Sequence, residues 1–142
     1  MTARQRLAAW RAREPLDRWL LIEAVAALAV ARLALVLLPF RTVATWLDHQ
    51  PAPRLYPDDL PARVGRATVT AARHVPWKAV CLPQALAARA LLARRGVVSR
   101  VYFGVARDGG VLSAHAWLEV DGQTVVGGGQ AKDRTVMIAQ FG

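Results

Sequence analysis

The stretch that decides the fold is residues 81–126, CLPQALAARALLARRGVVSRVYFGVARDGGVLSAHAWLEVDGQTVV. Its first part repeats Ala and Leu at helical spacing and ends at Gly96, a residue typical of a helix C-terminus. Pro83 is tolerated only in a first helical turn, so the helix is expected to begin at Cys81. After Gly96 the pattern changes from helical to alternating, which predicts strands.

The strands are separated by recognisable turns. Residues 97–106 alternate and are rich in β-branched and aromatic types. The sequence RDGG then leads into residues 111–120, and Asp121-Gly122 is a strong two-residue hairpin signal before QTVVGG. RTVMIAQF at residues 134–141 adds a fourth strand. These segments predict a small antiparallel β-meander.

Upstream of Cys81 the sequence predicts helices. DLPARVGRATVTAARHV repeats apolar residues at helical spacing, FRTVATWLD is a short amphipathic segment, and residues 1–14 form an Arg-rich tail. We expect an α+β domain in which the Cys-bearing helix packs on the meander. Residues 1–50 are expected to be a helical region and residues 51–142 the core, with 16–50 forming one compact unit with that core.

The segment 16–38 is apolar nearly all round and has two interpretations. About 20 apolar residues suffice to cross a bilayer. Glu23 and Arg32 interrupt the segment, and each would cost roughly 2.5–3.5 kcal/mol at mid-bilayer. We favour a buried core helix and expect no membrane span.

Composition narrows the class of protein. The chain has 142 residues, 54% apolar, with a net charge of +9, which favours anionic partners. No nucleic-acid-reading motif is present, and no nucleic acid is expected as a partner. The single cysteine excludes an intrachain disulfide and a zinc site of several thiolates. It fits a reducing compartment, and without a convincing signal peptide we expect the cytoplasm.

Cys81 is a candidate nucleophile because of its position. Unpaired backbone N–H groups at a helix N-terminus stabilise a thiolate and can also hold an oxyanion. The alternative is that a lone cysteine is a small buried hydrophobe.

His115 is the candidate base. It lies in the middle of a strand between two alanines, where strand propensity does not call for histidine. His49 lies beside a proline-rich loop, and His74 lies near a helix C-terminus, where a cation suits the dipole. A hydrogen-bonded core histidine remains the alternative for His115.

Cys81 and His115, in their sequence context, resemble a known family. CLPQALAARALLARRGV, then YFGVA, then AHAWLEVDG is similar to the B2 leader peptidases of lasso peptide biosynthesis, within the papain-like and transglutaminase-like cysteine enzymes. LIEAVAALAVARLALVLLPFRTVA also resembles the helical N-terminus of that family, so the resemblance extends from about Leu16 onward.

The resemblance implies a reaction and a set of partners. Cys81 would attack the amide between leader and core peptide, and His115 would serve as general base and acid. A precursor peptide would be the substrate, delivered by a small leader-binding protein. An ATP-using macrolactam cyclase would act afterwards. No cofactor and no metal are implied.

The acidic member of the family's Cys-His-Asp triad is missing from its expected place. Asp121 lies six residues along the strand from His115, roughly 20 Å away. Glu119 is on the same strand face but about 13 Å away. The hairpin register places His115 opposite Gly128, so the acid would be expected near 127–129, where the sequence is GGG. Asp133 is the remaining candidate, and Asp121 is better explained as a turn residue that tolerates positive φ.

Three further features have two interpretations each. Gln84 is either an oxyanion donor or a solvated helix residue. Trp117 is either part of the site wall or a core residue. The arginines on and after the Cys helix form a solvated face or a surface for an acidic leader or partner: Arg89, Arg94, Arg95 and Arg100. The competing function is a non-enzymatic membrane-associated or scaffold protein built around 16–38.

Overall fold

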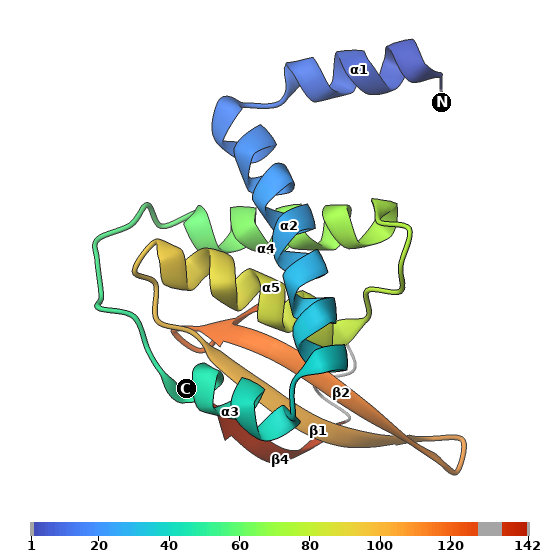
Figure 1. The fold of residues 1–142 in the computed structure, drawn as a ribbon, viewed down its shortest axis with the longest axis vertical. Coiled ribbons are helices and arrows are strands. Elements are labelled where there is room, and N and C mark those ends of the chain that lie inside the picture. The colour runs from blue at the N-terminus through green and yellow to red at the C-terminus, as the bar shows by residue number, and fades with distance from the viewer. Residues whose placement is uncertain (1, 128–134, 142) are drawn as a thin grey trace.

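The computed structural model describes residues 2–127 and 135–141. The elements in chain order are α1 (Ala3–Ala12), α2 (Pro15–Leu37), α3 (Phe40–Asp48), α4 (Leu60–His74), α5 (Cys81–Arg94), β1 (Arg100–Asp108), β2 (Val111–Val120), β3 (Gln123–Val126) and β4 (Thr135–Phe141). The expected α+β class is therefore confirmed, with the helices first and the strands last (Figure 1).

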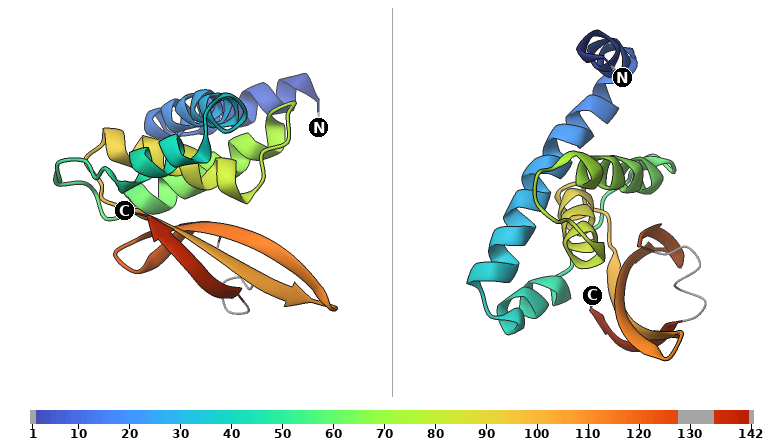
Figure 2. Two further views of the ribbon diagram at one scale, coloured as in Figure 1. Left: turned by 60° about the horizontal axis from the view of Figure 1, so that its bottom comes forward. Right: turned by 90° about the vertical axis from the view of Figure 1, so that its right-hand side faces the viewer.

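The helices and the sheet form two layers, with the helices on one side of a strongly curved sheet (Figure 2). The strand order is β3-β2-β1-β4, and the described ladders are antiparallel. The first three strands follow the predicted meander. β4 instead pairs with β1 at the opposite edge, so the chain crosses the sheet between its last two strands.

The core lies between α2, α4, α5 and the facing side of the sheet. In α5 the helical period and the run of small residues let both α2 and α4 pack closely against it. On the sheet, Leu118 and Val120 alternate toward this core along β2. The fully or nearly fully buried members include Leu20, Leu28, Val64, Ala71, Ala85, Leu92 and Val101. Burial of these apolar side chains supplies the main stabilising free energy.

Helix α2 is buried on one side only. Leu20, Ala24, Leu28 and Ala31 face α4 and α5. The opposite side exposes several large apolar side chains, namely Ile22, Val25, Val30, Leu33, Val36 and Leu37. The helix is also long and apolar enough to cross a membrane by length and composition. The description of 16–38 as a buried core helix is therefore correct only for the side of α2 that faces α4 and α5.

The structure contradicts the expectation that Arg89 lies on a solvated face. Arg89 is 1% exposed. Its guanidinium donates to the carbonyls of Leu47, His49 and Ser99 and lies 5.6 Å from the ring centroid of Trp46. Burial lowers the pKa of Arg89 from its ordinary value. Arg89 therefore ties α5 to the C-terminal end of α3 and to the residue just before β1.

Candidate active site

Cys81 is the first residue of α5 and is partly exposed. The preceding residue, Val80, is the N-cap and makes no side-chain cap hydrogen bond. The first turn contains no acidic residue, and Pro83 has no N–H. The Cys81 and Leu82 N–H groups thus lie at a helix end without a capping side chain, where backbone donors favour negative charge.

Gln84 has a structural partner. Its Nε2 donates to the carbonyl oxygen of Ala79 at 2.9 Å, and its backbone N–H donates to Val80 O at 3.2 Å. The side-chain amide therefore holds the loop that enters α5. One amide proton is committed to this bond, which leaves at most the other for an oxyanion.

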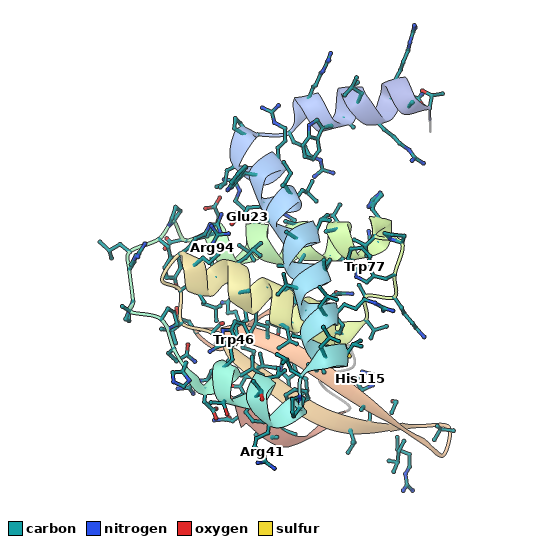
Figure 3. All side chains as sticks on the ribbon, viewed as in Figure 1. Glu23, Arg41, Trp46, Trp77, Arg94 and His115 are labelled. Atoms are coloured by element: carbon teal, nitrogen blue, oxygen red, sulfur yellow. The ribbon has the colours of Figure 1, made fainter. Side chains whose placement is uncertain are left out.

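His115 lies in the middle of β2 and is partly exposed (Figure 3). It pairs across the ladder with Gly104 of β1, which has no side chain. Strand alternation puts His115 on the same face as Trp117 and Glu119. β2 packs against α5 through Leu118 and Val120, which lie on the opposite face of the strand from His115.

The two side chains are not hydrogen-bonded to each other. Among the described residues, Cys81 has no hydrogen-bond partner within reach of its sulfur, and the bond made by His115 is to Ser113. In structures without substrate, catalytic hydrogen bonds are often long or poorly aligned. The structure therefore brings the two elements together and leaves the thiol–imidazole contact unmade.

Ser113 is the residue that contacts the His115 ring. Its Oγ lies 3.1 Å from His115 Nε2 and donates to the carbonyl of Ala106, directly opposite on β1, at 3.4 Å. The sequence reasoning missed Ser113. The signal was available, since residues two apart in a strand share a face.

Trp117 is buried, and its indole makes a ring-stacking contact and a hydrogen bond. The ring stacks on Tyr102 of β1 with centroids 5.6 Å apart, and Nε1 donates to Glu119 Oε2 at 2.9 Å. This hydrogen bond is accepted by Glu119, which lies two residues beyond Trp117 on the same strand face. Trp117 thus packs beside the histidine on the same face of the strand.

The backbone leaves no room for an acid at Gly127. Gly127 has φ +81°, and a Cβ there would lie 2.4 Å from the carbonyl oxygen of Ala116. Such a contact is prohibitive for any side chain. The predicted register is also shifted by one residue, because a bulge pairs Leu118 with Val126. Gly128, Gly129 and Asp133 lie outside the described residues.

Asp121 is placed in the hairpin turn, with φ +49°. Its Oδ2 accepts a hydrogen bond from the hydroxyl of Tyr56 at 3.2 Å. Burial raises the pKa of Tyr56, and the neighbouring Asp121 carboxylate raises it further. Asp121 therefore contacts the loop before α4, at the end of β2 distant from His115.

Arg94 at the end of α5 and Arg95, its C-cap, bind an acid on α2. Glu23 is 7% exposed and pairs with Arg94 Nη1 at 2.6 Å and with Arg95 Nη2. Figure 3 shows Glu23 and Arg94 side by side between the two helices. Arg94 is largely exposed and Arg100 is exposed, in agreement with a solvated face for these two.

The site thus combines a cysteine at an uncapped helix N-terminus with a histidine on the strand packed against that helix. Residues 20–139 match the family model described as "Transglutaminase-like superfamily". The match covers most of the chain, and the chain belongs to this superfamily, which includes cysteine peptidases. No curated protein and no solved structure matches the chain.

Proposed function

We propose that this chain is a cysteine peptidase that removes the leader peptide from a lasso peptide precursor. The observation that carries the proposal is the placement of Cys81 at the uncapped N-terminus of α5, on a helix packed against the strand of His115. Membership of the transglutaminase-like superfamily and the resemblance to lasso leader peptidases support it.

The proposed reaction has two steps. His115 takes the proton of the Cys81 thiol, and the sulfur attacks the carbonyl carbon between leader and core. The C–N bond then breaks, His115 returns the proton to the leaving amine, and a thioester remains. In the second step His115 deprotonates a water molecule, which hydrolyses the thioester and frees Cys81.

The N-terminus of α5 supplies the electrostatic part of the mechanism. The tetrahedral intermediate carries a negative oxygen, and the backbone N–H groups of Cys81 and Leu82 are the nearest donors at this helix end. Removing one such donor in acyl-transfer enzymes costs about 100- to 1000-fold in rate. The proposed mechanism requires the imidazole of His115 to come within reach of the Cys81 thiol.

The partners in this proposal are the precursor peptide and a small leader-binding protein that delivers it, with a macrolactam cyclase acting on the product. The reaction takes place in the cytoplasm. The net charge of +9 suits an acidic leader or partner surface.

Incubation with a lasso precursor and its leader-binding protein, followed by mass spectrometry, tests the proposal. The wild-type chain should release the leader at the junction with the core. Cys81→Ala and His115→Ala should release none, while Asp121→Asn, a control in the distant turn, should keep most of the activity.

Two outcomes contradict the proposal. Full activity of Cys81→Ala would remove the peptidase assignment. A loss in Asp121→Asn as large as in Cys81→Ala would show that the turn carboxylate takes part in the site.

A second candidate function is membrane-surface attachment without catalysis, and the exposed side of α2 favours it. The large apolar side chains on that side are accompanied by exposed arginines, including Arg32 on α2 and Arg4, Arg6 and Arg11 on α1. An apolar helix face with flanking cations is typical of interfacial helices. Flotation with anionic and neutral vesicles tests this function. Binding only to anionic vesicles that Leu33→Ser/Val36→Ser abolishes would support it, and no binding to either vesicle would reject it.

A further inference from the structure

We infer that Ser113 is the positioning residue of the catalytic histidine, in the place that an acid occupies in a Cys-His-Asp triad. The inference rests on the proposed function for its catalytic meaning. The observation is the hydrogen-bonded chain from His115 Nε2 to Ser113 Oγ and from there to the carbonyl of Ala106.

The direction of the protons follows from the donors available. A serine hydroxyl has one proton, and the carbonyl of Ala106 can only accept. Both contacts are satisfied together when Ser113 donates to Ala106 and His115 Nε2–H donates to Ser113. The neutral ring then carries its proton on Nε2 and its lone pair on Nδ1. Nδ1 is therefore the nitrogen that takes the thiol proton.

The backbone holds Ser113 in place for this role. Ser113 and His115 are two residues apart on one face of β2, and Ser113 is paired directly with Ala106 in the β1–β2 ladder. The acceptor is a main-chain carbonyl of a strand, which moves little. The ring is thus tied to the β1–β2 ladder.

The acid has no equivalent place in the described part of the chain. At Gly127 the close approach to Ala116 O excludes a side chain. Asp121 is committed to the turn and to Tyr56, and Glu119 accepts from Trp117. A serine orients the ring through hydrogen bonding alone, without the charge by which a carboxylate stabilises an imidazolium.

Ser113→Ala tests the inference, with Ser113→Thr as the matched variant that keeps a hydroxyl. In the leader-release assay Ser113→Ala should lower kcat about 10- to 100-fold and leave KM unchanged, because the residue acts through His115. Ser113→Thr should stay within about threefold of wild type, and Asp133→Asn should have little effect.

A spectroscopic measurement makes the test independent of the reaction. In ¹H–¹⁵N spectra of histidine side chains, the wild-type chain should show a slowly exchanging Nε2–H of His115. Its assignment comes from loss in His115→Gln, and Ser113→Ala should also lose it while Ser113→Thr retains it. Since this readout needs no substrate, it stands even if the precursor is not cleaved.

Two results would overturn the inference. One is an unchanged Nε2–H signal in Ser113→Ala with the fold retained. The other is wild-type kcat in Ser113→Ala together with loss of kcat in Asp133→Asn, which would assign the role to Asp133.

Discussion

The two ends of α5 are bonded very differently. At the C-terminal half, Arg89 donates to three main-chain carbonyls, and Arg94 and Arg95 pair with Glu23 of α2. At the N-terminal end, Cys81 is partly exposed behind an N-cap that makes no side-chain bond. One end fixes the helix in the fold, while the other leaves its backbone donors without a capping side chain.

This difference teaches how stability and reactivity share one helix. Buried polar groups with satisfied partners rigidify their surroundings. Unsatisfied donors at a helix end cost stability and are retained where they serve a ligand or a reaction. Substitutions at the C-terminal half should therefore change unfolding, and substitutions at the N-terminal end should change rate.

The largest expected effect is that of Cys81→Ala on activity. Leader release should fall at least about 1000-fold, because the nucleophile is lost. The free energy of unfolding should change by less than about 1 kcal/mol, since Cys81 is only partly buried. Urea unfolding and mass spectrometry measure the two quantities. A destabilisation of several kcal/mol would mean that Cys81 is a structural residue.

Arg89→Ala should have the opposite effect to Cys81→Ala, with a large loss of unfolding free energy. It removes the Arg89 donors to the carbonyls of Leu47, His49 and Ser99, of which Ser99 keeps the bond from Gln50 Nε2, and opens a cavity beside Trp46. The expected loss of unfolding free energy is about 3–5 kcal/mol. Arg100→Ala, on an exposed arginine close in sequence, is the control and should stay within about 0.5 kcal/mol. Equal losses of unfolding free energy in Arg89→Ala and Arg100→Ala would show that the hydrogen bonds of Arg89 do not stabilise this end of α5.

Glu23→Gln should have an intermediate effect on stability. It removes the charge paired with Arg94 and Arg95 at a site that is 7% exposed. We expect a loss of about 1–2 kcal/mol in urea unfolding. Arg94→Gln is the matched control: because Arg94 is 69% exposed, its loss should be about 1 kcal/mol or less. A larger loss for Arg94→Gln than for Glu23→Gln would place the stability on the exposed side of the pair.

The smallest expected effect is that of Val80→Ser. Serine is a preferred N-cap, and the exposed Val80 has little packing to lose, so α5 should gain about 0.5–1 kcal/mol. The same hydroxyl would occupy an N–H group at the site, so leader release should fall. A stabilised variant with undiminished activity would show that these N–H groups do not serve the reaction.

The sequence predicted the elements better than their arrangement. Helix α5 and the β2–β3 hairpin were predictable because period, Pro83, Gly96 and Asp121-Gly122 act locally. The position of β4 beside β1 was not predictable from the sequence. Which edge of the sheet a strand joins depends on the packing of the whole fold and not on the residues of the strand itself. The one-residue bulge next to Leu118 shifted the register of the β2–β3 pair. It was not predictable either, because no residue in the sequence marks the extra position.

Side-chain partners were predictable only where they are close in sequence. Arg89 binds the carbonyls of Leu47 and His49, some 40 residues earlier, which no periodicity reveals. Ser113 is two residues from His115, so strand alternation alone predicts that the two side chains share a face. Cys81 and His115 were recognisable as a candidate pair from the sequence motifs around them. The distance between their side chains was not predictable, because it depends on how β2 packs on α5.

The most direct test of the Cys81–His115 pair is the rate of alkylation of Cys81 by iodoacetamide at pH 6, because this chain has one cysteine. A histidine that takes the thiol proton raises the reactive thiolate fraction. Wild type should therefore react at least about tenfold faster than His115→Ala, while His74→Ala, on an exposed histidine of α4, should react like wild type. Equal rates for wild type and His115→Ala would contradict the account.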